Sequence, residues 1–240
     1  MSEAVIFFND KKIFILDKNS NSELSNSFKI DTYNRFVAER LLDFIKSKVI
    51  NNNADISAVI TDSVDGILVP SDIYNSQKKE AFYTLNYSKI DAGKILLEEE
   101  ISSINATMIY SCKKWFHDFV HEHLGPISIS NSTTSFLRKI LAQKDSGNMH
   151  LVIKESTFDL IKLQDKTLLS FNVIEYSTMT DIVYFLIAHL NKLDTKDIAI
   201  QVFGSEIQIK ELEKIKNKIL TLNETNIVFK PHTEFLQFIK

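Results

Sequence analysis

Three histidines stand close together near the middle of the chain, in the run His117-Asp-Phe-Val-His121-Glu-His123. In a helix, His117 and His121 would lie one turn apart, which is the spacing at which metal-binding helices present two imidazole ligands. The order differs from the HExxH pattern of zinc proteases, and no third cluster of ligands is evident in the sequence. We therefore expect a solvated helix face and no metal site.

Other polar residues also have an ordinary structural explanation. Cys112 stands at the start of the same predicted helix, where a helix N-terminus could lower the pKa of a thiol, but no activating partner is evident. The oxygen-rich run at residues 61–66 lacks the ligand count and terminal glutamate of a calcium loop and indicates a turn. The serines and threonines of residues 128–134 lack the glycine-flanked turn of a nucleophile elbow. We predict no catalytic residue.

The composition limits the class of protein. A chain of 240 residues with 44% hydrophobic residues can bury one large core or two small ones. Its 28 basic and 31 acidic residues give a net charge of -3, so no overall positive field attracts nucleic acid. A single cysteine allows no intrachain disulfide and fits a reducing compartment. No apolar run approaches the roughly 20 residues that span a bilayer. We expect a cytoplasmic protein without a membrane span.

The first half of the chain shows a β-β-β-α-β-α pattern. Apolar, β-prone runs at residues 4–8 and 13–17 flank a polar turn and predict a hairpin. Apolar residues at helical spacing predict a helix over residues 33–50. Residues 56–69 predict a fourth strand or a pair of strands that ends at Pro70. The remaining predicted elements are strands at 28–30, 95–98, 106–110 and 127–130, and helices at 111–123 and 133–143.

The same order begins again after the polar residues 144–148. A hairpin, a third strand, a helix and a fourth strand recur after about 140 to 146 residues, which is the mark of a duplicated domain. We therefore predict an α/β protein with a first lobe at residues 1–146 and a second at 147–240. The predicted elements of the second lobe are strands at 149–153, 158–163, 168–174, 198–203 and 227–229, helices at 180–193 and 206–220, and a last helix from Thr233.

Paired lobes of this order are the architecture of the actin, sugar-kinase and heat-shock-ATPase superfamily. The runs at residues 4–17, 150–163 and 198–205 resemble its lobe openings and its fourth strand. Along nearly its whole length, including residues 171–176 and 181–186, the chain is similar to an uncharacterised bacterial family, a domain of unknown function related to the pilus-assembly and cell-division branch. The resemblance implies two ribonuclease-H-like lobes and an actin-like ATPase fold. Because its motifs are hydrophobic patterns rather than catalytic signatures, it supports the fold far better than the function.

The resemblance also indicates where a nucleotide would bind. Active members hold ATP and a divalent metal between the lobes through acidic, glycine-rich hairpins, because backbone N–H groups must approach phosphate closely. Here the matching turns, residues 9–12 and 154–157, contain no glycine. Active members usually carry a pair of glycines at the strand end that binds adenosine. Here the matching position has one glycine, Gly204, and Ser205 can be explained equally well as the ordinary N-cap of the following helix. If ATP and Mg²⁺ bound, the resemblance would place them at Asp10, Lys11, Glu155, Gly204 and Ser205.

A cradle without glycines loses most of its backbone donors. We therefore expect no cofactor and a non-catalytic protein with the actin-like fold, which binds or scaffolds an unidentified protein partner. The alternative is a nucleotide-binding actin-like ATPase with degenerate phosphate loops. A third possibility is a cleft that takes another small molecule, and ligand binding distinguishes the three.

Overall fold

The computed structural model describes residues 2–9, 11–17, 27–51, 53–143, 149–164, 167–190, 197–222 and 226–232. The chain divides into two compact units, of which the first takes residues 1–138 and the second begins at Lys139. The predicted boundary between residues 146 and 147 and the predicted helix from Thr233 lie outside the described residues.

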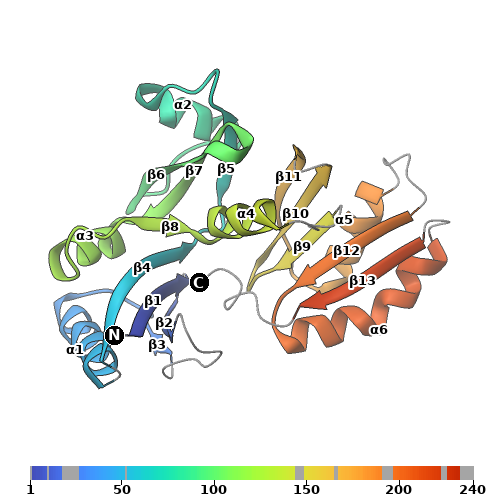
Figure 1. Cartoon of the computed structure of the whole chain (residues 1–240). Coiled ribbons are helices and arrows are strands. Elements are labelled where there is room, and N and C mark those ends of the chain that lie inside the picture. Colours follow the sequence, from blue (N-terminus) through green and yellow to red (C-terminus); the bar gives the residue numbers. More distant parts are fainter. Residues whose placement is uncertain are drawn as a thin grey trace. The chain divides into compact units, whose positions relative to one another are not determined.

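The first unit is built on a five-stranded sheet of order β3-β2-β1-β4-β8 (Figure 1). β1 is antiparallel to β2 and parallel to β4, and residues 4–8 of β1 are all buried, as expected for a central strand covered on both faces. The predicted hairpin, third strand and fourth strand are thus confirmed. The strands are β1 (Ser2–Asn9), β2 (Lys12–Asp17), β3 (Phe28–Lys29), β4 (Ala54–Asp62) and β8 (Ile129–Asn131).

Helices α1 (Arg35–Asn51) and α3 (Lys114–His123) share one hydrophobic core with this sheet. Leu41 of α1 and Phe116 of α3 are fully buried in it. The side chain of Asn34 caps α1, since its Oδ1 accepts a hydrogen bond from the backbone of Val37 at 3.0 Å. Helix α4 (Ser132–Ala142) follows β8 directly.

A second, three-stranded antiparallel sheet is inserted between β4 and β8 (Figure 1). Its order is β5-β7-β6, and Tyr83 of the short helix α2 packs into its small core. Residues 56–69 therefore form a pair of strands, because β4 and β5 belong to different sheets. The insertion consists of β5 (Gly66–Pro70), the 3-10 turn η1 (Ser76–Lys78), α2 (Lys79–Thr84), β6 (Lys94–Ile101), the 3-10 turn η2 (Ser102–Ile104) and β7 (Ala106–Lys113).

One boundary inside this insertion differs from the prediction. The predicted helix over residues 111–123 begins three residues later, at Lys114, because residues 111–113 continue the ladder of β7 with β6. Ser111 and Cys112 are buried in that strand. Pairing of β7 with β6 therefore keeps residues 111–113 in a strand, and the helix begins only after them.

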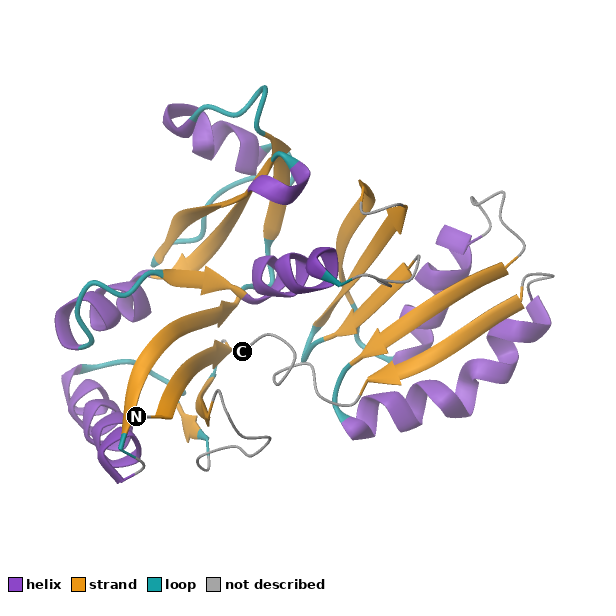
Figure 2. Cartoon of the chain, viewed as in Figure 1, coloured by secondary structure: helices purple, strands orange, loops and turns teal. Residues whose placement is uncertain are grey.

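The second unit repeats the topology of the first sheet. Its strand order is β11-β10-β9-β12-β13, with β9, β10 and β11 antiparallel and β12 and β13 parallel to β9. Figure 2 shows α5 and α6 beside this sheet, and both helices contribute to its core. The elements are β9 (Met149–Ile153), β10 (Thr157–Gln164), β11 (Thr167–Glu175), α5 (Met179–Leu190), β12 (Asp197–Phe203), α6 (Glu206–Leu222) and β13 (Asn226–His232).

The two units confirm the predicted repeat of a β-β-β-α-β-α order. In each sheet the first strand lies between the second and the fourth, and the fifth strand is the outer neighbour of the fourth. The units differ in the connection from the fourth to the fifth strand, which is α6 in the second unit and the inserted sheet with α2 and α3 in the first. No helix among the described residues is long and apolar enough to cross a membrane.

Candidate functional site

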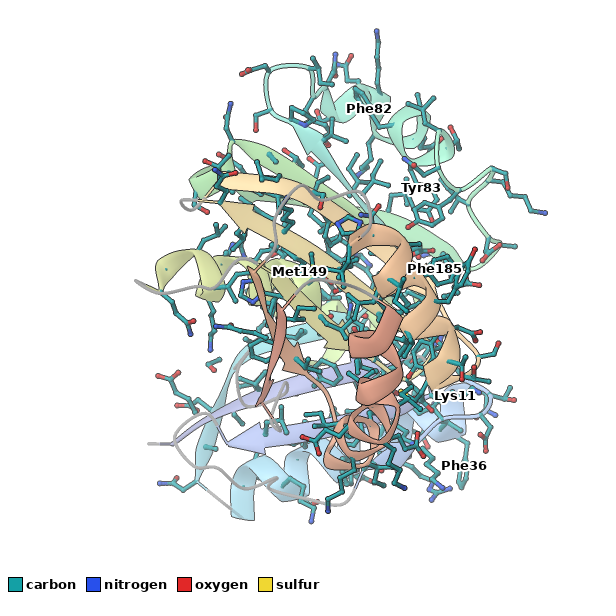
Figure 3. The ribbon with its side chains drawn as sticks, turned by 90° about the vertical axis from the view of Figure 1, so that its right-hand side faces the viewer. Lys11, Phe36, Phe82, Tyr83, Met149 and Phe185 are labelled. Carbon is teal, nitrogen blue, oxygen red and sulfur yellow. The ribbon has the colours of Figure 1, made fainter. Side chains whose placement is uncertain are left out.

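The turn between β1 and β2 is held by the side chain of Asn9. Its Oδ1 accepts hydrogen bonds from the backbone N–H of Lys12 at 2.9 Å and of Lys11 at 3.4 Å. Lys11 lies at the surface on this turn (Figure 3). Asp10 lies outside the described residues. The two backbone donors that follow Asp10 are therefore already engaged by a side chain of the same turn.

The turn between β9 and β10 closes in the same compact way. The backbone N–H of Lys154 donates to the carbonyl of Thr157 at 2.9 Å, and Glu155 is exposed at the tip. Neither Glu155 nor Ser156 has a positive φ. The turn therefore needs no glycine, which explains why the sequence carries none here.

The cation of this second turn points into the protein. Lys154 Nζ lies 3.0 Å from Asp159 Oδ2, and the two side chains are 2% and 1% exposed. A buried ammonium is held by its carboxylate partner, because separating the two would leave a charge in a medium of low polarity. Lys154 is thus committed to the structure of the hairpin.

Gly204 and Ser205 form the junction between β12 and α6. Ser205 is the N-cap of a capping box with Gln208: Ser205 Oγ accepts from the Gln208 backbone at 3.3 Å, and Gln208 Oε1 accepts from the Ser205 backbone at 2.9 Å. A Cβ on residue 204 would lie 3.3 Å from both Gln208 Oε1 and Ile153 Cβ. The glycine is explained by this close approach of β12 to β9.

Gln208 joins this junction to the β9–β10 turn. The carbonyl of Lys154 accepts hydrogen bonds from Gln208 Nε2 at 2.7 Å and from the Tyr176 hydroxyl at 2.6 Å. Partial burial, together with the negative charge of Glu211 and Glu155, raises the pKa of Tyr176 although the hydrogen bond with Gln208 lowers it. The phenol therefore stays protonated and can donate.

The structure thus brings together three of the residues predicted at a nucleotide site. Glu155, Gly204 and Ser205 lie at one edge of the second sheet, where β9 and β12 end side by side. Lys11 belongs to the first unit. Gln208, which hydrogen-bonds both Ser205 and the carbonyl of Lys154, was missed because a glutamine in the first turn of a helix has no special signal unless the capping serine is considered with it.

A second polar site, centred on Asp65, was also missed. Asp65 is buried and accepts hydrogen bonds from the hydroxyls of Ser63 and Tyr83 at 2.6 Å and of Ser111 at 2.5 Å. Lys94 Nζ lies 3.1 Å from its Oδ2. Burial alone would raise the pKa of Asp65, but the hydrogen bonds from these three hydroxyls and the charge of Lys94 outweigh it and lower the pKa.

A small cavity lies next to Asp65, at the carboxyl ends of β1 and β4. It has room for about one water molecule and is partly open to solvent. On one wall Asp62 accepts a hydrogen bond from Ser132 at 2.6 Å, which ties β4 to the start of α4. The lining residues are Phe8, Thr61, Asp62, Ser63, Val64, Lys94, Ser111, Cys112 and Lys113.

Comparison with known proteins assigns the family. A family model, described as a protein of unknown function (DUF3822), matches residues 9–222. The chain belongs to the DUF3822 family. This confirms the resemblance to an uncharacterised domain family. Sequence comparison of the DUF3822 chain with curated proteins gives no match.

Solved structures confirm the actin-like fold of the DUF3822 chain. A Bacteroides thetaiotaomicron protein with actin-like ATPase fold and unknown function has a TM-score of 0.73 at 14% identity, over 99% of this chain and 95% of that one. A chain of the PilM–PilN type IV pilus biogenesis complex has a TM-score of 0.59 at 12% identity, over 99% and 90%. The ethanolamine utilization protein EutJ from Carboxydothermus hydrogenoformans has a TM-score of 0.51 at 8% identity, over 99% and 87%.

The cysteine of the DUF3822 chain is a buried structural residue. Cys112 lies in β7 and is 2% exposed. Burial, and then the negative charge of Asp65, raises the pKa of its thiol to about 12. Since the thiolate is the reactive form, Cys112 is a poor nucleophile at neutral pH.

The histidines of α3 lie on the surface of the first unit. The rings of His117 and His121 have their centres 4.4 Å apart, and His123 packs against Phe119 with a centre distance of 5.0 Å. Within the described part of the DUF3822 chain, no group of three or more histidine, cysteine, aspartate or glutamate side chains could hold a metal ion.

Proposed function

We propose that this protein is a non-catalytic member of the actin-like fold that acts as a binding or scaffolding module for a protein partner. The observation that carries the proposal is the capping box of Ser205 and Gln208. It fills the junction where the resemblance would place a nucleotide, and it engages the backbone N–H groups of both residues.

The loss of donors is the physical argument. A helix N-terminus binds phosphate through backbone N–H groups that have no other acceptor. At the start of α6, two of these groups already donate within the capping box, and Gln208 Nε2 holds the neighbouring turn through the carbonyl of Lys154. A nucleotide would have to break these hydrogen bonds before it gained its own.

The turns support the same proposal. In the first turn, the backbone donors of Lys11 and Lys12 are taken by Asn9. In the second turn, the ammonium group of Lys154 is buried against Asp159. The first turn therefore offers the exposed side chain of Lys11 but not the open backbone that a phosphate cradle requires. The exposed side chain of the second turn, Glu155, carries a negative charge that repels phosphate.

A role in binding a protein has one further support. One structural neighbour is a chain of the PilM–PilN complex of type IV pilus biogenesis, so a protein of this fold occurs in an assembly with another protein. For the present protein, we propose only that the partner is another protein. The reducing, cytoplasmic setting remains the prediction made from its single cysteine.

The proposal is tested by titration calorimetry of the full chain with Mg-ATP and Mg-ADP up to about 1 mM, a concentration that would detect dissociation constants tighter than about 1 mM. We expect no saturable heat. Ser205→Asp is the matched variant, because aspartate is also a good N-cap but places a negative charge where a phosphate would lie. Wild type and variant should behave alike.

The opposite outcome would support the alternative function. Saturable binding of Mg-ATP to the wild type, weakened by Ser205→Asp and by Lys11→Ala, would show that the predicted residues do hold a nucleotide. The protein would then be an ATP-binding actin-like protein with degenerate phosphate loops, and the scaffold proposal would be wrong.

A further inference from the structure

The exposed face of α3 carries a pair of histidines in a geometry suited to a metal ion. His117 and His121 stand one helical turn apart, with ring centres 4.4 Å apart and ring planes at 58°. The His117 side chain is 28% exposed and His121 is exposed. Both imidazoles therefore lie within reach of solvent and of each other.

The distance between the rings can be compared with that of a chelate. A coordinating imidazole nitrogen lies about 2.0–2.1 Å from the metal, and the ring centre lies about 1.1 Å beyond that nitrogen. Two such rings at right angles would have centres about 4.5 Å apart, whereas a tetrahedral angle would separate them by about 5.2 Å. The observed 4.4 Å is close to the right-angled case, which occurs in octahedral and tetragonal sites, so one ion can bridge the two rings when their coordinating nitrogens turn toward it.

A carboxylate orients one of the two rings. His117 Nδ1 lies 3.1 Å from Asp118 Oδ1, while Lys114 Nζ donates to the other oxygen of Asp118 at 2.7 Å. An ionised carboxylate can only accept hydrogen bonds, so Nδ1 of His117 carries a proton, and in the neutral imidazole Nε2 is then the nitrogen with the lone pair. A carboxylate on the second nitrogen is the usual partner of a metal-binding histidine.

The same face carries negative charge. Partial burial raises the pKa of Tyr33, and the charges of Glu122 and Asp118 raise it further. Asp118 and Glu122 directly follow His117 and His121 in α3, so their negative charges lie beside the imidazoles. This negative charge favours a cation there.

We propose that His117 and His121 form a two-histidine site for a divalent transition metal ion, with Ni²⁺ or Cu²⁺ as the preferred ions and Asp118 as a positioning residue. No third protein ligand stands in reach among the described residues, so the remaining positions are open to water or to a donor from another molecule. Imidazole ligands suit these ions, and right-angled geometry favours Ni²⁺ over Zn²⁺. The site is independent of the proposed scaffold function.

The test is calorimetric titration of the full chain, without a polyhistidine tag, with NiCl₂. We expect one Ni²⁺ ion per chain. His117→Ala and His121→Ala should each weaken binding by about tenfold or more, because each removes one ligand of the chelate. Asp118→Asn should weaken binding by about tenfold, because it removes the carboxylate that orients His117.

His123→Ala is the matched control. It removes a histidine from the same helix, but the ring of His123 packs against Phe119. The affinity of His123→Ala for Ni²⁺ should stay within about twofold of that of the wild type. Circular dichroism of each variant checks that the fold is kept.

A second measurement needs no substitution. Paramagnetic Ni²⁺ should broaden the NMR signals of the His117 and His121 rings before those of His123. The proposal would be overturned by the absence of saturable Ni²⁺ binding, by equal losses in His123→Ala and His121→Ala, or by broadening that does not start at the His117 and His121 pair.

Discussion

At the scale of single residues, Asp65 joins several segments of the first unit, and no sequence motif indicated this role. It receives hydroxyl groups from the β4–β5 connection, from α2 and from β7, and an ammonium group from β6. Four separate segments thus converge on one buried carboxylate. The run at residues 61–66 predicted the turn correctly but could not show the burial, because the other partners stand 18 to 46 residues further along the chain.

The ionised form of Asp65 should stabilise the protein. The folded state lowers the pKa of this carboxyl group below its unfolded value, so its contribution is present above about pH 4 and is lost as the pH falls through the folded-state pKa. At neutral pH, Asp65→Asn should reduce the free energy of unfolding by about 2–4 kcal/mol, because it leaves Lys94 partly buried without this partner. Denaturant unfolding at pH 7 and at pH 3 measures both effects.

The second carboxylate beside Lys94 provides the control. Asp91 Oδ2 lies 3.3 Å from Lys94 Nζ, but its side chain is 64% exposed. Asp91→Asn should change the free energy of unfolding by less than about 1 kcal/mol. In Asp65→Asn, the loss of stability between pH 7 and pH 3 should be smaller than in the wild type. An unchanged acid dependence would mean that Asp65 does not titrate with folding.

At the scale of elements, the β9–β10 hairpin shows what hydrophobic pattern can and cannot predict. The apolar runs at residues 149–153 and 158–163 predicted both strands of the hairpin, and β9 agrees to the residue. The pattern did not predict that Lys154 and Asp159 bury their charges against each other. Charged residues next to a turn normally lie in solvent, and only the tertiary structure can reverse that expectation.

Removing one partner of the buried ion pair should lower the free energy of unfolding strongly, whereas replacing both partners with apolar residues should lower it much less. Lys154→Met leaves the charge of Asp159 buried, and it should lower the free energy of unfolding by about 3–5 kcal/mol. Adding Asp159→Leu removes that charge, so the double variant should recover much of the loss. Denaturant unfolding of the wild type, both single variants and the double variant completes the cycle.

Lys162→Met controls for the change from lysine to methionine. Lys162 lies in the same hairpin but is only partly buried, and its substitution should have a much smaller effect. If Lys154→Met and Lys162→Met proved equally mild, the ion pair would contribute no more than a surface contact. If the double variant were as unstable as the single variants, the polar character of the pair would itself be required.

At the scale of the whole molecule, duplication was predictable and the insertion was not. Both lobes begin with the same order of a hairpin, a strand, a helix and a strand, and this repeat in the sequence predicts the duplication. The inserted sheet has strands and a helix with the same local signals, so periodicity alone cannot assign β5 to a different sheet from β4. The candidate nucleotide residues were placed by resemblance, and the contacts that fill their site appeared only in the folded chain.

Each unit has its own hydrophobic core, which leads to a prediction about the whole chain. One core draws its residues from Ala4 to Ile129, and the other from Met149 to Ile215. Leu186→Ala removes a fully buried side chain from the second core and should cost about 2–5 kcal/mol. Because protection against hydrogen exchange follows local stability, amide exchange should rise across the second unit and change little in β1 and β4.

A matching substitution in the first core allows the two units to be compared within the same protein. Leu41→Ala removes a fully buried leucine from the first core, and it should raise exchange in β1 and β4 while β9 and β10 stay protected. Hydrogen exchange read by mass spectrometry on both variants separates the two cases. Equal loss of protection in both units from either substitution would show that the two cores unfold as one cooperative body. A confined loss would show that duplication left two units whose stability is set separately.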